Sequence, residues 1–188
     1  MCADQFCSST PRRRFRRVAL PAVLAFAASG SALAASGWTS VGSTGTVDET
    51  CVTSIQQSSY EARFAPGTTP ARCTIRYQVF DTWDGPPARS VTLGARFIDN
   101  GFLARVIIRL HALDLASGAA REVGRLDSND FGDVGGYQIQ RTGPDCLALD
   151  FSRNSYWIEV SLSRYTPPTT PLQGVAATGL LFVEDCLI

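Results

Sequence analysis

The fold class follows from one stretch of the chain, Tyr156-Trp157-Ile158-Glu159-Val160-Ser161-Leu162-Ser163. Its apolar residues alternate with residues that tolerate water, so one side of an extended chain is apolar and the other is solvated. An amphipathic α-helix would instead need apolar residues three and four positions apart. The stretch therefore predicts a half-buried β-strand.

Seven further segments show a similar pattern. They are residues 73–80, 91–97, 102–113, 121–126, 137–141, 146–151 and 174–183. The last of them is apolar on both sides, which predicts a central strand covered on both faces. Helical spacing is absent beyond residue 34. The sequence therefore predicts an all-β protein, a two-sheet antiparallel β-sandwich of jelly-roll or immunoglobulin-like type with about eight strands.

Residues 1–34 have the pattern of a cleaved signal peptide. Five arginines lie within residues 12–17, an apolar run covers residues 18–28, and Ala32 and Ala34 have the spacing of a cleavage site. The apolar run is roughly half the ~20 residues that a membrane-spanning helix needs. We therefore expect no stable membrane insertion, and export to the periplasm or the exterior of a bacterial cell.

The basic part of this leader leaves two export routes open. Arg12-Arg13-x-Phe15 resembles the twin-arginine signal of bacteria. Arg16 stands where that signal has an apolar residue, so an ordinary secretion signal is the alternative. After cleavage we expect an irregular N-terminal arm over residues 35–50 and a single β-sandwich domain over residues 51–188.

The exported part of the chain is mildly acidic. Loss of the leader removes five of the 17 basic residues and one of the 17 acidic residues, which leaves a net charge near −4. Nucleic-acid binding depends on Lys and Arg that displace counterions from phosphate, so we expect no nucleic-acid partner. The chain has no lysine, which excludes Schiff-base chemistry and a phosphate-binding P-loop.

Four cysteines remain after the leader: Cys51, Cys73, Cys146 and Cys186. An even number in an exported chain predicts two disulfides. Three pairings are possible, and we favour Cys51–Cys73 together with Cys146–Cys186, the second of which would tie the C-terminal strand to a central one. A metal site is the weaker interpretation, because the chain has no C-x-x-C motif and one histidine.

The turn that contains Asp81, Trp83 and Asp84 is a candidate carbohydrate site. An exposed indole can stack on a sugar ring while carboxylates accept hydrogen bonds from the sugar hydroxyls. Trp157 lies on the outward side of its predicted strand and would add a second platform. The alternative is that both tryptophans close the ends of the core.

The densest acidic loop suggests calcium as the one candidate cofactor. Its ligands would be the oxygens of Asp127, Asn129, Asp130 and Asp133, because Ca²⁺ takes six to eight oxygen ligands. Phe131 occupies a ligand position of the EF-hand pattern, so the match is partial. The alternative is a solvated turn with Asx hydrogen bonds and no cofactor.

The remaining polar residues give weaker indications. His111 is the only histidine, and no G-x-S-x-G motif accompanies it, so the sequence indicates no serine-hydrolase triad. Four arginines on the outward sides of predicted strands could form a basic stripe for an acidic glycan or a partner's carboxylates; they are Arg76, Arg96, Arg105 and Arg109. The alternative is that they pair with acids on neighbouring strands.

Together these features predict an exported, non-catalytic binding module for carbohydrate or another envelope component. One alternative is a small secreted hydrolase that uses a pair of carboxylates. Another is a structural or assembly subunit that pairs through a strand edge. The sequence leaves the ligand, the strand topology and the oligomeric state open.

Overall fold

The computed structural model describes residues 37–69, 71–99, 103–132, 134–143, 145–164 and 176–186. The predicted signal peptide and Asp133 lie outside these ranges. Within them the regular structure is β-strand and three 3₁₀ turns, Gly42–Thr44, Glu49–Cys51 and Ser128–Asp130. No helix in this part of the chain has the length and apolar character needed to cross a bilayer.

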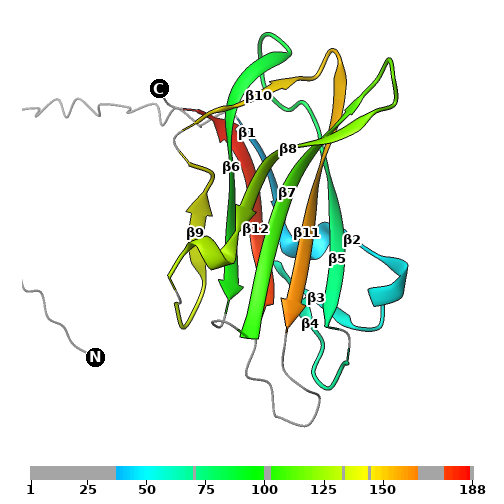
Figure 1. The fold of residues 1–188 in the computed structure, drawn as a ribbon, viewed down its shortest axis with the longest axis vertical. Helices are drawn as coiled ribbons and strands as arrows, with labels where there is room; N and C mark the ends of the chain where they lie inside the picture. The colour runs from blue at the N-terminus through cyan, green and yellow to red at the C-terminus, as the bar shows by residue number, and fades with distance from the viewer. Residues whose placement is uncertain are drawn as a thin grey trace, which may run out of the picture. The chain divides into compact units, whose positions relative to one another are not determined.

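Two antiparallel sheets form the predicted sandwich, as Figure 1 shows. Five strands of the seven-stranded sheet follow the order β10 (Leu147–Asp150), β6 (Ala88–Asp99), β12 (Ala176–Asp185), β4 (Glu61–Phe64), β3 (Ile55–Ser58). Two more pair beside this path: β1 (Gly37–Val41) with β12, and β9 (Gln138–Arg141) with β6. The five-stranded sheet follows the order β2 (Thr46–Val47), β5 (Arg72–Val79), β11 (Asn154–Arg164), β7 (Ala104–Asp114), β8 (Ala120–Asp127).

The alternation that predicted the strands also places the core. On β11, Tyr156, Ile158 and Leu162 are at most 1% exposed, so their side of the strand faces the other sheet. Ile158 pairs with Leu110 of β7, and both are fully buried. Complete burial of a large apolar side chain contributes roughly 1.5–3 kcal/mol. The polar side of the same strands therefore forms the outer face of the five-stranded sheet.

Strand β12 is central, as predicted, because it pairs with β6 on one side and with β1 and β4 on the other. Leu181 and Val183 point into the core and are fully buried. Phe182, on the opposite side, is also buried, and it packs over Gly94 of β6, where a Cβ would clash with the ring. The guanidinium of Arg141 covers the Phe182 ring at 5.0 Å from its centre.

The structure corrects the predicted irregular arm over residues 35–50. Residues Gly37 to Val41 form β1, which pairs with β12, and Trp38 within it is buried. The described residues therefore form twelve strands rather than about eight. The four additional ones, β1–β4, have two to five residues each. Such short strands give too few alternating positions for a pattern to show.

Both favoured cysteine pairings are present. Cys51, at the end of a 3₁₀ turn, is bonded to Cys73 of β5, with Cα atoms 5.6 Å apart. Cys146 is bonded to Cys186, with Cα atoms 5.8 Å apart. Cys146 directly precedes β10, which lies at the edge of its sheet, so this disulfide ties the C-terminal strand to an edge strand rather than to a central one.

Candidate ligand-binding groove

An open groove of about 590 Å³ lies at one end of the sandwich. Strands of both sheets form it: the first residues of β6 and β8, the last residue of β7, strand β10, and the turn that leads into β11. Ligand pockets in proteins commonly have volumes of about 300–1,000 Å³. The groove is therefore large enough to hold a small ligand or part of a polymer.

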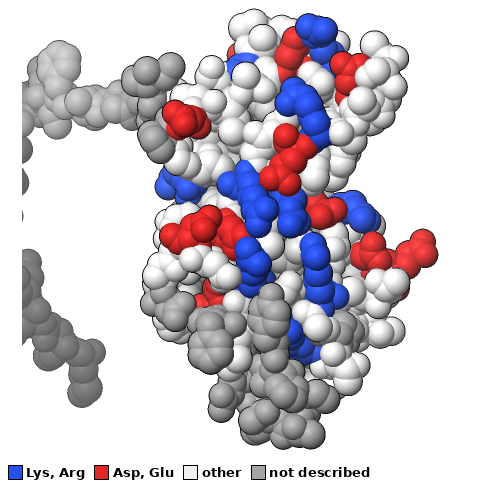
Figure 2. Space-filling model, in the orientation of Figure 1, with Lys and Arg blue, Asp and Glu red and all other residues white. Residues whose placement is uncertain are grey.

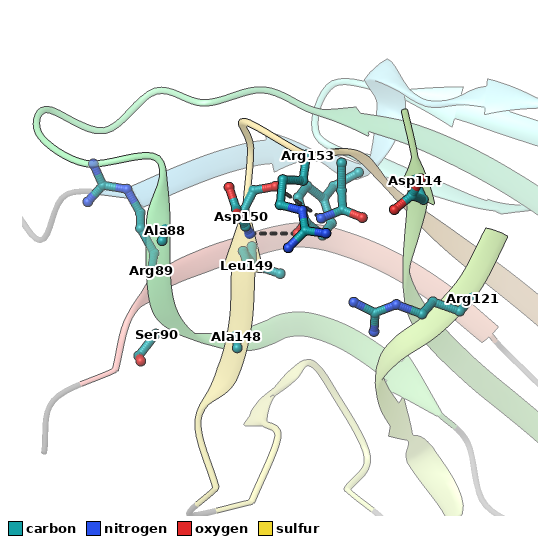
Figure 3. A pocket seen from close by; sticks show the side chains of 11 residues that line it. Ala88, Arg89, Ser90, Asp114, Arg121, Ala148, Leu149, Asp150 and Arg153 are labelled. Carbon is teal, nitrogen blue, oxygen red and sulfur yellow. Dashed lines mark hydrogen bonds between the residues drawn. The ribbon is translucent and has the colours of Figure 1, made fainter. Parts of the chain in front are cut away.

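Three arginines line this groove, as Figure 3 shows. Arg121 comes from β8 and extends toward the centre of the groove, and Arg153 lies above β10 beside Asp150. Arg89 comes from β6 on the opposite wall, and its guanidinium points away from the other two. Two guanidiniums from separate elements thus share the middle of the groove.

Arg89 is a fixed part of the wall. Its side chain is 9% exposed, and its Nη2 donates a hydrogen bond to the backbone oxygen of Asp84 at 2.8 Å. The guanidinium carbon lies 5.4 Å from the centre of the Trp83 ring, and Nη1 lies 3.9 Å from a carboxylate oxygen of Asp185. These contacts hold Arg89 in place.

Two carboxylates of the groove are held as acceptors in turns. Asp114 Oδ1 accepts hydrogen bonds from the amide of Ser117 at 2.8 Å and from its hydroxyl at 2.9 Å. These bonds, with the nearby charge of Arg153, lower the pKa of Asp114 below its ordinary value. Asp150 Oδ1 accepts from the amide and the hydroxyl of Ser152 at 3.0 and 2.6 Å. Both acids therefore serve the chain itself.

Arg121 and Arg153 differ from these residues. Among the residues that the structure describes, neither side chain has a hydrogen bond or an ion-pair partner within 4.0 Å. Both residues are exposed. A guanidinium carries five N–H donors and a permanent charge, so these two groups can donate to an acceptor that enters the groove.

The predicted sugar-binding turn does not line the groove: Asp81 and Asp84 are exposed outside it, and Trp83 is buried. Trp83 is 6% exposed and packs against Phe151, with ring centres 5.5 Å apart. The amide of Trp83 donates to Asp81 Oδ1 at 3.4 Å, and the backbone oxygen of Asp84 holds Arg89. The prediction that Trp83 is an exposed platform is wrong, because its ring closes the end of the core and supports the groove wall.

Trp157 faces outward, as predicted, but it does not lie beside Trp83. It is half-buried on the outer face of the five-stranded sheet and stacks on His111, its partner on β7. The ring centres are 4.9 Å apart and the planes differ by 12°. The imidazole therefore covers one face of the indole, and that face is not available to a sugar.

The structure gives Asp127 a different role from the predicted calcium ligand. Its carboxylate, 4% exposed, accepts from Arg105 Nε at 2.9 Å and from Arg125 Nη2 at 2.8 Å. Burial by itself would raise the pKa of Asp127, but these hydrogen bonds outweigh it and lower the pKa to about 2. The amide of Asn129 donates to the same carboxylate, so the loop is an Asx-type turn.

The rest of the acidic loop does not assemble a metal site within the described ranges, where no three histidine, cysteine or acidic groups are arranged to hold an ion. Asp130 is exposed at the end of the 3₁₀ turn, and Asp133 lies outside the described residues. The predicted calcium site therefore lacks Asp127 as a ligand, because the carboxylate of Asp127 is bound by two arginines.

The predicted arginine stripe divides between the two sheets. Arg96 lies on β6 of the seven-stranded sheet, where its guanidinium covers the Tyr137 ring at 4.0 Å from its centre. The other three lie on the outer face of the five-stranded sheet, where each has an acidic partner: Arg76 with Asp48, Arg105 with Asp127, Arg109 with Glu122 and Glu159. Figure 2 shows blue and red side chains interspersed over this face. The stripe prediction is therefore wrong, and cross-strand pairing accounts for these three residues.

Sequence patterns do not single out the groove arginines. Arg121 and Arg153 lie next to turns and carry no motif, and they are 32 positions apart in the chain. Only the pairing of β8 with β7, and of β7 with β11, brings them to one end of the sandwich. The absence of lysine was the one feature of the sequence that pointed toward them, since it means that any cationic binding site in this chain must use arginine.

Comparison with known proteins gives a likeness of fold alone. No protein-family model matches the sequence, and the curated proteins contain no match to it. Among solved structures, the chain is similar to a xylan-binding domain from CBM 22, formally called the x6b domain. The similarity has a TM-score of 0.41 and 9% sequence identity, and it covers 85% of this chain and 92% of that domain.

Proposed function

We propose that this chain is an exported binding module that holds a carbohydrate or another envelope component in the end groove, without catalysis. The observation that carries the proposal is the groove of about 590 Å³, in which neither Arg121 nor Arg153 has a hydrogen bond or an ion pair among the described residues. Sugar hydroxyls and carboxylates both accept hydrogen bonds, so they suit the donors that Arg121 and Arg153 present in the groove.

The construction of the groove supports binding by a rigid surface. Its walls are strands of both sheets, and sites on such elements hold side chains more accurately than sites on loops. Ala88, Ala148 and Leu149 add apolar surface between the charged groups. Tyr156 accepts a hydrogen bond from the amide of Asp150 at 2.7 Å and thereby ties β10 to the core beneath the groove.

The acids of the groove support a non-catalytic role. The general acid of a glycosidase needs a raised pKa so that it carries a proton near neutral pH. The pKa of Asp114 is lowered instead, first by the hydrogen bond from the Ser117 amide. Asp150 also uses an oxygen to hold its own turn. Asp114 therefore does not have the environment of a proton donor.

Export is the second part of the proposal. Two disulfides are typical of proteins that fold in oxidising compartments, which supports the predicted leader. N-terminal sequencing of the protein isolated from its native host should find a start near residue 35. Retention of the first thirty residues, or four free thiols in the folded protein, would contradict export.

The binding proposal can be tested by calorimetric titration with neutral and acidic oligosaccharides. We expect saturable binding that Ala148→Trp abolishes, because Ala148 is exposed in the groove and an indole would fill it. Ala71→Trp is the matched control, since Ala71 is exposed next to the start of β5, at the other end of the sheet. Absence of binding to every class of saccharide, or equal loss in both variants, would overturn the proposal.

A further inference from the structure

We infer that the end groove selects ligands that carry a carboxylate, of which an oligosaccharide with uronic acid units is the class that fits; this rests on the proposed function. Three of the twelve arginines beyond residue 34 line this single groove, in a part of the chain whose net charge is near −4. Arginines are therefore concentrated at this groove, although acids outnumber them in this part of the chain.

The guanidiniums of the groove differ in their partners. The lining holds three guanidiniums and two carboxylates, those of Asp114 and Asp150. Arg89 is already engaged with Asp84 and Asp185 on the far wall. Arg121 and Arg153, which lie in the middle of the groove, are therefore its guanidiniums without a hydrogen bond or an ion pair among the described residues.

The position of these two side chains suits a carboxylate. Arg121 extends inward from β8, while Arg153 extends from the turn between β10 and β11 (Figure 3). A guanidinium fork matches the two oxygens of a carboxylate, and such charge-assisted hydrogen bonds are about twice as strong as neutral ones. A ligand carboxylate near Arg121 and Arg153 would satisfy donors that have no partner among the described residues.

Asp114 opposes anion binding without preventing it. Its carboxylate is near enough to Arg153 to be influenced by that charge, so it partly neutralises this arginine. Because Oδ1 is held by the turn at residues 114–117, the carboxylate is fixed in place. Removing the negative charge while keeping Oδ1 should therefore strengthen the binding of an anionic ligand.

The test compares one ligand in two charge states. Oligogalacturonate and its methyl ester have nearly the same shape, but only the first carries carboxylates. By calorimetry on the exported protein, we expect the acid to bind at least about tenfold more tightly than the ester, with a preference that declines as NaCl is raised. Inorganic sulfate serves as a competitor, and displacement at millimolar concentration would show that charge alone suffices.

Variants assign the preference to the groove. Arg121→Ala should weaken binding of the acid about tenfold and of the ester less than twofold, and Arg121→Lys should lie between wild type and Arg121→Ala, because it keeps the charge without the fork. Asp114→Asn should tighten binding of the acid a few fold and leave the ester unchanged. Arg72→Ala is the charge-matched control, since Arg72 lies at the opposite end of β5. Circular dichroism and melting curves establish that each variant is folded.

The outcomes separate this inference from the proposed function. Equal binding of acid and ester would overturn the inference and leave the binding function intact. A preference for the acid that survives both Arg121→Ala and Arg153→Ala would place the charged site elsewhere and also overturn it. Failure of both ligands and of all neutral saccharides would overturn the proposed function itself.

Discussion

The arginines of the end groove and those of the outer face of the five-stranded sheet have the same chemistry but opposite surroundings. On the sheet, Arg109 lies 3.3 Å from Glu122 and 3.5 Å from Glu159, on the two neighbouring strands. In the groove, Arg121 and Arg153 have no such partner among the described residues. The arginines of the outer face form ion pairs with acids of neighbouring strands, and the two groove arginines remain available to a ligand.

Strand register explains this difference. In the five-stranded sheet, Arg109 of β7 stands directly opposite Glu159 of β11, so a regular ladder brings opposite charges together. Arg121 lies near the start of β8, and Arg153 lies in the turn before β11. Arg121 stands opposite Ala112 of β7, which carries no charge, and Arg153 lies in a turn outside the ladder, so neither guanidinium meets a cross-strand acid.

The largest effect should come from the aromatic support behind the groove. Trp83→Ala should cost about 3–5 kcal/mol of unfolding free energy, because it empties the buried space beside Phe151. It should also weaken ligand binding, since Arg89 loses the ring that it covers. Trp157→Ala, on the outer face, should cost about 1 kcal/mol. Urea unfolding measures both, and equal losses would show that Trp83 is not a core residue.

Removal of each disulfide should lower the stability of the fold, but removal of only one of them should also weaken ligand binding. Replacing either pair by alanine should cost about 3–4 kcal/mol, the entropy of loops of 22 and 40 residues. Only removal of Cys146–Cys186 should also weaken binding, because Cys146 anchors β10, a wall of the groove. Chemical unfolding and titration of each double variant test this. Equal loss of affinity in the two would remove the distinction.

Among the charged residues of the outer face, Asp127 should have the largest effect on the free energy of unfolding at acid pH. Its pKa is lowered from 3.8 to about 2, so its ion pairs stabilise the fold by about 2 kcal/mol above pH 4. Because the folded-state pKa is the lower one, this stability is lost as the pH falls from about 4 through 2. Asp127→Asn should remove this part of the acid sensitivity, as measured by urea unfolding at several pH values. An unchanged acid profile would contradict the buried ion pair.

The smallest effect on stability should be that of the groove arginine itself. Arg121→Ala should change the unfolding free energy by less than about 0.5 kcal/mol, since it removes no hydrogen bond or ion pair among the described residues. The melting temperature, followed by circular dichroism, should therefore stay near that of the wild type. A loss of 2 kcal/mol would show that Arg121 is a structural residue like Arg105.

The sequence was most informative where strands are long. The alternation in residues 156–163 and 102–113 predicted β11 and most of β7, with the correct side of each strand in the core. It was uninformative for β1–β4, because two to five residues hold too few alternations to distinguish a strand from a loop. Trp83 shows a second limit of prediction from the sequence, because the composition of its turn is compatible with an exposed ring and with a buried one.

By itself, the sequence determined the β-sandwich class, the inward and outward sides of its long strands, and the even set of cysteines, because these depend on local alternation and on composition. Only the tertiary structure decided which arginines are neutralised and which have no acidic partner among the described residues. That outcome depends on the pairing of strands distant along the chain, which sets the acid that each guanidinium meets. Local patterns carry no information about such partners.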